Sequence, residues 1–189
     1  ILATGLLSDD NRLTSATKRL VLQAFAVILY IYLSKLYIYE TRLIFLDDLL
    51  ENNLSLKILF TSICILILMN GFNFIDGTNT LAAGYASIVL LGLLMFLFDN
   101  SSEYEIRNIQ YLLSFLIIFL FFNFFSKAFL GDGGSYLIST VLGIICIRLA
   151  IHFEYVISPF FIALLLWYPA LENLFSIVRR VIYQKKNAN

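Results

Sequence analysis

Asn70-Gly-Phe-Asn-Phe-Ile-Asp-Gly-Thr-Asn-Thr-Leu-Ala-Ala-Gly84 is the stretch that decides how this chain folds. It interrupts very apolar sequence with side chains that are expensive to place beside lipid and that usually line a bundle interior or a watery cavity. If Asn70 and Asn73 occupy the last turn of a helix, their spacing places them on one face, and Asp76 follows on that face. Gly77 would then end the helix. A hydrophilic turn between two membrane helices, without chemistry, is the alternative interpretation.

The composition of the chain indicates an integral membrane protein. Of its 189 residues, 60% are hydrophobic and only 14% are charged, whereas a soluble domain has roughly a quarter charged residues. The mean hydropathy is +0.87. Cys64 and Cys146 each fall inside an apolar run, which favours buried small hydrophobic residues over a disulfide or a metal site.

Apolar runs divide the chain into membrane-spanning candidates. The run 58–69 is short for a span, which needs roughly 20 residues, but it extends to 54–72. The segment 34–57 is mixed and predicts an external loop with a short interfacial helix around 44–50. The fold class predicted is an all-α polytopic membrane helix bundle with about six transmembrane helices, kinked near Pro169 and Glu172. The six runs are 20–33, 58–69, 81–98, 109–125, 136–150 and 159–178.

The order of the spans places the polar stations of the sequence on one side of the membrane. With six spans, two crossings separate each station from the next, so all of them share one face. The stations are Asp9 with Asp10, Asp76, Asp132, and the tail from Arg179. Positive residues gather on the cytoplasmic side of membrane proteins, and the basic residues on this side are Arg12, Lys18, Arg19, Lys127, Arg179, Arg180, Lys185 and Lys186. We therefore expect the polar stations to face the cytoplasm.

The residue types at these stations predict a site for a hard cation and a phosphate. Oxygen ligands without His or Cys suit Mg²⁺, which takes one or two protein carboxylates together with substrate phosphates. Lys18 and Arg19 add positive charge for a phosphate. The glycines around Asp132 allow close backbone approach to a ligand, and the helix N-terminus expected at Ser135 favours an anion.

Four blocks of sequence carry a resemblance to a known family. They are Asp9-Asp10 followed by Ser15, Lys18 and Arg19-Leu20; Asn70 to Gly84; Phe129-Leu-Gly-Asp-Gly-Gly-Ser135; and Pro169 to Arg180. Together they resemble the polyprenyl-phosphate N-acetylhexosamine-1-phosphate transferases, which include the phospho-MurNAc-pentapeptide translocase and the enzymes that start O-antigen and teichoic acid synthesis. The Asn70 block is closer to the O-antigen-initiating branch, and so to lipopolysaccharide synthesis, than to the peptidoglycan translocase.

The resemblance implies a Mg²⁺-dependent transferase, with Mn²⁺ as a substitute, that moves an N-acetylhexosamine 1-phosphate from a UDP-sugar to polyprenyl (undecaprenyl) phosphate and releases UMP. It places Asn79 near the uracil and leaves open whether Asp9 is a nucleophile, a base or an orienting residue. The implied roles are catalytic for Asp9 and Asp10, metal-binding for Asn73 and Asp132, and substrate-binding for Lys18, Arg19, Asn70, Asp76 and Asn79.

The setting implied is the bacterial cytoplasmic (inner) membrane, with lipid as a partner and no nucleic acid; a homodimer is left open. Residues 1–189 would form a single transmembrane catalytic domain, and we expect a fragment that lacks N-terminal helices and the family's histidine-containing C-terminal cytoplasmic loop. Such a fragment is not expected to be active alone. The alternatives are an ion or solute transporter, with carboxylates near the bilayer midplane, and a non-catalytic relic of the transferase family.

Overall fold

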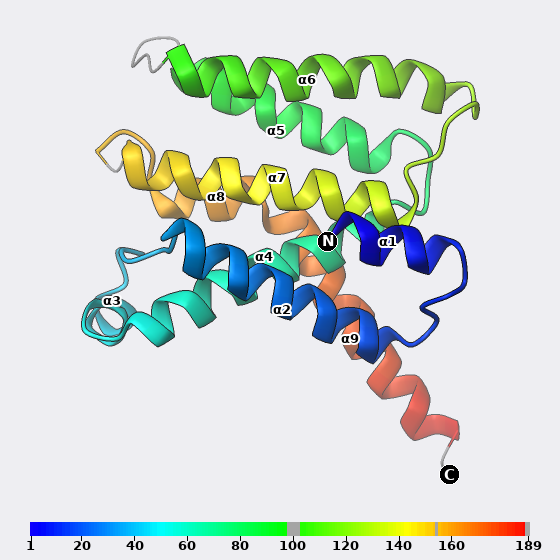
Figure 1. The fold of residues 1–189 in the computed structure, drawn as a ribbon, viewed down its shortest axis with the longest axis horizontal. Helices are drawn as coiled ribbons and strands as arrows, with labels where there is room; N and C mark the ends of the chain where they lie inside the picture. Colours follow the sequence, from blue (N-terminus) through cyan, green and yellow to red (C-terminus); the bar gives the residue numbers. More distant parts are fainter. Residues whose placement is uncertain (98–102, 154, 188–189) are drawn as a thin grey trace.

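The computed structural model describes residues 1–97, 103–153 and 155–187, and these residues form helices and loops without a strand (Figure 1). The predicted all-α helix bundle is confirmed, and the short helix expected around 44–50 is present. The described helices are α1 (Leu2–Asp9), α2 (Ala16–Ser34), α3 (Ile44–Glu51), α4 (Leu54–Ile75), α5 (Leu81–Leu97), α6 (Glu103–Phe124), α7 (Gly131–His152), α8 (Pro159–Leu165) and α9 (Trp167–Asn187).

Among the residues that the structure describes, fewer helices are long and apolar enough to cross a membrane than the six predicted. By length and composition, α2, α4, α6 and α7 qualify, and α8 with the first part of α9 adds a fifth only if this pair, bent by 61°, is one span. α5 is apolar but has 17 residues, which is short against the roughly 20 that a straight span needs. Within the described residues, each predicted apolar run nevertheless falls in a helix or a pair of helices; residue 98, the end of the predicted run 81–98, lies outside them.

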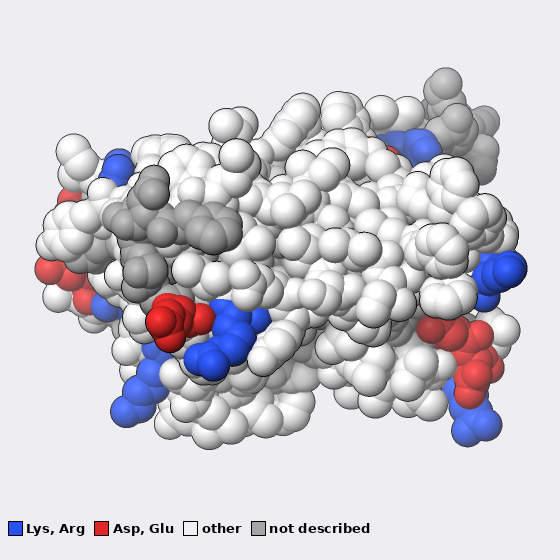
Figure 2. Space-filling model, turned by 90° about the horizontal axis from the view of Figure 1, so that it is seen from above, with Lys and Arg blue, Asp and Glu red and all other residues white. Residues whose placement is uncertain are grey.

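α4 is the centre of the bundle. It packs against α2, α3, α5, α7 and α9, while α5 and α6 form a layer at one edge (Figure 1). Met69 and Phe72 on α4 are fully buried. Aromatic side chains on α6 such as Phe115 and Phe121 are instead largely exposed, as expected of a face in contact with lipid. On the face in Figure 2 the charged side chains gather towards the two ends and leave the middle uncharged.

Two glycines allow helices to approach closely. A methyl group added at Gly71 would lie 2.1 Å from the backbone carbonyl oxygen of Pro169, so α4 and α9 touch through their backbones there. A methyl group at Gly5 would lie 2.3 Å from the Cα of Gly133, which joins α1 to the first turn of α7 in the same way. Gly71 directly follows Asn70, and Gly133 directly follows Asp132, so both approaches lie beside residues singled out in the sequence.

The predicted kink lies N-terminal to Pro169, at Leu166, which separates α8 from α9. Proline has no N–H, so Pro169 cannot bond the carbonyl of Leu165 four residues earlier. The hydroxyl of Tyr85 on α5 donates a hydrogen bond to that carbonyl. The bend therefore falls in the turn before the proline, and its freed carbonyl is satisfied by a neighbouring helix.

We predict that Gly71→Ala lowers the stability of the bundle by about 1–3 kcal/mol, because α9 must move away from α4 to admit the methyl group. Thermal unfolding in detergent measures this. Gly84→Ala on α5 is the matched control, because a methyl group there meets no atom within 4 Å. Equal losses in the two variants would contradict the close packing of α4 on α9.

Candidate functional site

The first turn of α7 is held by a carboxylate from the end of α1. α7 begins at Gly131, whose φ of 65° lies in the left-handed region that favours glycine. The Asp9 carboxylate accepts hydrogen bonds from the backbone N–H groups of Asp132 at 2.9 Å and Gly133 at 3.1 Å. The first N–H groups of a helix lack partners within the helix, and negative charge is favourable beside them. Asp9 therefore caps α7, which starts earlier than the expected N-terminus at Ser135.

Asp132 accepts hydrogen bonds from three other helices. Its Oδ1 accepts from Asn73 Nδ2 on α4 at 2.6 Å. Its Oδ2 accepts from Ser8 Oγ on α1 and from Arg19 Nη1 on α2, both at 2.6 Å. The side chains of Arg19 and Asp132 are 25% and 26% exposed, so water only partly screens this ion pair. We call Ser8, Asp9, Arg19, Asn73 and Asp132 the rim cluster.

Negative charge accumulates at the rim cluster. Burial, together with the charges of Asp132 and Asp9, raises the pKa of Asp76, just past the end of α4, from 3.8 to about 6, although a backbone hydrogen bond with Gly131 opposes the shift. The negative charges of Asp132 and Asp9 thus act on Asp76, close to where Arg19 contacts Asp132. Such an arrangement favours binding of a further cation.

The other predicted site residues lie outside these contacts with Asp132. Asp10 is exposed and pairs weakly with Arg12 at 3.8 Å. Lys18 is exposed and directly precedes Arg19 on α2, so the two side chains leave the helix about 100° apart. Asn70 donates to the backbone carbonyl of Leu66 on its own helix at 2.8 Å. Asn70 and Asn73 lie three residues apart in the last turns of α4, as expected, and of the two it is Asn73 that contacts Asp132.

Asn79 belongs to a set of hydrogen bonds, here called the loop tie, that joins two loops at the same end of the bundle as the rim cluster. Its Nδ2 donates to Ser126 Oγ at 2.8 Å. Asn123, buried at the end of α6, accepts from the Thr80 N–H at 2.5 Å and donates to the Ala128 carbonyl at 2.7 Å. The loop after α4 is thereby fastened to the loop before α7. Asn123 was not predicted as a site residue; its signal in the sequence is a lone amide in a phenylalanine-rich run.

The rim cluster contains the donor types that Mg²⁺ takes, although within the described residues no group of three or more His, Cys, Asp or Glu side chains could hold a metal. Mg²⁺ needs only one or two protein carboxylates when substrate phosphates supply the rest. The Asp132 carboxylate and the Asn73 amide oxygen fit such a site, given that the amide can turn its oxygen to where its nitrogen now donates. Their role as metal ligands remains a prediction.

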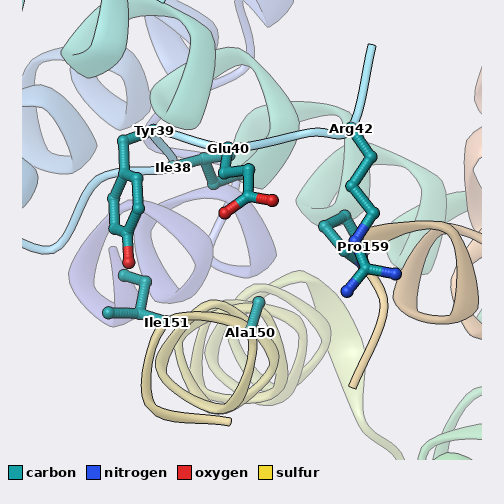
Figure 3. A pocket seen from close by; sticks show the side chains of 7 residues that line it. All are labelled: Ile38, Tyr39, Glu40, Arg42, Ala150, Ile151 and Pro159. Carbon is teal, nitrogen blue, oxygen red and sulfur yellow. The ribbon is translucent and has the colours of Figure 1, made fainter. Parts of the chain in front are cut away.

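Two cavities lie away from the rim cluster. One, of about 20 Å³, is lined by Ile38, Tyr39, Glu40, Arg42, Ala150, Ile151 and Pro159 (Figure 3). It has room for about one water molecule. The other, of about 380 Å³, is an apolar space among α4, α7, α8 and α9 that both cysteines line. Neither is lined by a residue of the rim cluster.

We predict that Asp76→Asn flattens the pH dependence of stability between about pH 4 and 6. Because the folded state raises the pKa of this carboxyl from 3.8 to about 6, the folded protein binds more protons than the unfolded protein in this window, and stability falls as pH rises through it. Thermal unfolding from pH 4 to 7 measures the effect. Asp48→Asn, at an exposed position on α3, is the control; a slope unchanged by Asp76→Asn would contradict the prediction.

The part of the chain that resembles a known protein family contains every residue of the rim cluster. The family model described as glycosyl transferase family 4 matches residues 1–150. No solved structure matches the chain significantly.

Several curated relatives are named phospho-N-acetylmuramoyl-pentapeptide-transferase. That of Prochlorococcus marinus subsp. pastoris (strain CCMP1986 / NIES-2087 / MED4) is 31% identical over 187 residues, which cover 95% of this chain and 52% of the relative. That of Prochlorococcus marinus (strain MIT 9515) is 32% identical over 181 residues, covering 90% and 49%. The chain thus spans about half the length of the curated relatives it matches. On the family match and these identities, the chain belongs to glycosyl transferase family 4.

Proposed function

We propose that this chain carries the catalytic rim of an enzyme that transfers an N-acetylhexosamine 1-phosphate from a UDP-sugar to polyprenyl phosphate and releases UMP. The observation that supports this most is the convergence on Asp132 of side chains from α1, α2 and α4. They place an arginine, a carboxylate and an amide together at one end of a membrane bundle. The membership in glycosyl transferase family 4 supports the same reaction class.

Phosphoryl transfer requires little covalent chemistry from the protein and depends on positioning and electrostatic stabilisation. The acceptor phosphate is already largely dianionic at neutral pH, because its second pKa is near 6. A general base therefore has little proton to remove. We assign Asp9 an orienting role, because both of its carboxylate oxygens accept hydrogen bonds from the first turn of α7, where Asp132 is placed.

The other residues of the rim cluster and its neighbours would bind the substrates and neutralise phosphate charge. Arg19 would contact a substrate phosphate, because its guanidinium already reaches the centre of the cluster, and Lys18 and Asp10, both exposed, would act at its edge. Asp132 and Asn73 would hold Mg²⁺ or Mn²⁺, which when bound neutralises the negative charge on diphosphate oxygens. Asn79, in the loop tie, would lie beside the uracil.

Two UDP-sugars are candidates for the donor, and each would lead to a different glycan. The relatives are named for a muramoyl-pentapeptide donor, whereas the Asn70–Gly84 stretch resembles the branch that initiates O-antigen. UMP release from UDP-MurNAc-pentapeptide and from UDP-N-acetylglucosamine, each with undecaprenyl phosphate, separates them. We place the rim cluster on the cytoplasmic face of the inner membrane, because basic residues share the side of the membrane on which the polar stations lie.

We predict that Asp132→Asn in the full-length protein lowers UMP release at least 100-fold, since a group that stabilises transition-state charge is commonly worth 10²–10³ in rate. The assay contains UDP-sugar and polyprenyl phosphate in detergent. Asp48→Asn is the control and should retain wild-type turnover. Undiminished turnover of Asp132→Asn would remove this residue from the reaction, and a wild-type protein without UMP release would favour the non-catalytic alternative.

We further predict that chelation with EDTA abolishes UMP release, and that added Mg²⁺ or Mn²⁺ restores it. The rim cluster offers hard oxygen donors, so Zn²⁺, which prefers nitrogen and sulfur ligands, should restore much less. Full activity in EDTA would contradict a metal requirement. The Asp132→Asn experiment would still test whether Asp132 takes part in the reaction.

A further inference from the structure

Ser8, in the last turn of α1, donates its hydroxyl hydrogen to another helix. Serine and threonine hydroxyls within helices commonly bond a backbone carbonyl of the preceding turn, and other hydroxyls of this chain do so. They belong to Thr4, Thr61, Ser87, Ser114, Ser139 and Thr140. Ser8 instead donates to Asp132 Oδ2 on α7 at 2.6 Å, and its oxygen accepts from Arg19 Nη1 on α2. A half-buried hydroxyl thus joins a cation and a carboxylate from two other helices.

The glycine contact between α1 and α7 allows Ser8 to reach this position. Gly5 precedes Ser8 by three residues, so the two share a helix face, and a methyl group at Gly5 would lie 2.3 Å from the Cα of Gly133. The close approach brings the end of α1 to the first turn of α7, whose backbone Asp9 caps. Asp9 therefore acts on the backbone of this turn, and Ser8 acts on the side chain of Asp132.

The hydrogen bonds of Asp132 are unevenly divided between its two oxygens. A carboxylate has about four acceptor sites, two on each oxygen. Oδ2 accepts from the Ser8 hydroxyl and from Arg19 Nη1, whereas Oδ1 accepts from Asn73 Nδ2. If the Asn73 amide turns, its oxygen takes the place from which its nitrogen now donates. Oδ1 and the amide oxygen would then face one space, which is suited to a cation.

We propose that Ser8 is a positioning residue that holds Asp132 Oδ2 beside Arg19 and so directs Oδ1, on the side of Asn73, towards a divalent cation. This inference rests on the proposed function, in which Asp132 and Asn73 hold Mg²⁺ or Mn²⁺. Ser8 touches no reacting atom in this account; it acts through Asp132. Both bonds that Arg19 makes here use Nη1, so the N–H groups on Nε and Nη2 are not needed for them and can face a substrate phosphate.

The test measures the Mn²⁺ dependence of the full-length protein with Ser8→Ala, which removes the hydroxyl and introduces a strong helix former. The Mn²⁺ concentration for half-maximal UMP release should rise about 10-fold, because hydrogen-bond partners of metal ligands are typically worth 10- to 100-fold in metal affinity or activity. The KM for polyprenyl phosphate should stay unchanged, because Arg19 is still present. Ser8→Thr keeps the hydroxyl and should restore the wild-type Mn²⁺ dependence.

A second readout does not need turnover. A cation that binds only the folded protein raises its melting temperature, and the same rise in Ser8→Ala should need about 10-fold more Mn²⁺ than in the wild type. Thr4→Val is the matched control, because it removes a hydroxyl of α1 that bonds the Ile1 carbonyl at 2.7 Å. This variant should keep the wild-type Mn²⁺ dependence in both readouts.

The outcomes separate this inference from the proposed function. Wild-type Mn²⁺ dependence in Ser8→Ala, with turnover still lost in Asp132→Asn, would overturn the positioning role and leave the transferase standing. A defect that Ser8→Thr does not repair would also overturn it, because the hydroxyl would not be the group responsible. If Ser8→Ala does not fold, Ser8→Cys, whose thiol is a weak donor, decides by the same criteria.

A wild-type protein that releases no UMP still gives a decision. Stabilisation by Mn²⁺ that weakens in Ser8→Ala would then support the inference and reject the transferase. A wild-type melting temperature that does not respond to Mn²⁺, together with turnover that needs no metal or is absent, would overturn the inference, because there would be no cation for Asp132 to bind.

Discussion

The structure depends on satisfying one carboxylate at the edge of a membrane bundle. A charged group removed from water is costly unless partners surround it, and Asp132 meets this requirement with Ser8, Arg19 and Asn73 from three other helices. No single helix could supply them. The need to pair Asp132 therefore fixes how α1, α2, α4 and α7 meet, and the glycine contact between Gly5 and Gly133 lets α1 come close enough to take part.

The same requirement separates two acids that are adjacent in sequence. Asp9, although exposed, points at the start of α7 and caps it, where the helix N-terminus favours negative charge, while Asp10, also exposed, lies 3.8 Å from Arg12. The anion site at the start of α7 is thus already filled by the protein's own carboxylate. Phosphate recognition then falls to side chains around Asp132, above all to Arg19, rather than to the start of α7.

Hydropathy was sufficient to predict an all-α membrane bundle, and the order of the polar stations predicted that Asp76 and Asp132 lie on one side of the membrane. The pairing of Asn73 with Asp132 as metal ligands came from the family resemblance, and the structure places the two side chains in contact. Finer features needed coordinates. Helical spacing could not tell that Asn70 would bond its own helix while Asn73 reached across. The bend at Leu166 leaves the carbonyl of Leu165 without its helical partner, and Tyr85 from another helix bonds it. Asn123 joins loops that only the fold brings together. Apart from the Asn70 bond to its own helix, these are contacts between distant segments, on which local pattern carries no information.

A double-mutant cycle of unfolding free energies on Arg19→Met and Asp132→Asn tests the central claim most directly. If Asp132 is paired with Arg19 in a partly desolvated site, the two losses should be strongly non-additive, with a coupling of about 0.5–3 kcal/mol. Additive losses within about 0.3 kcal/mol would show that the two side chains do not interact, and the convergence of α1, α2 and α4 on α7 would then need another cause.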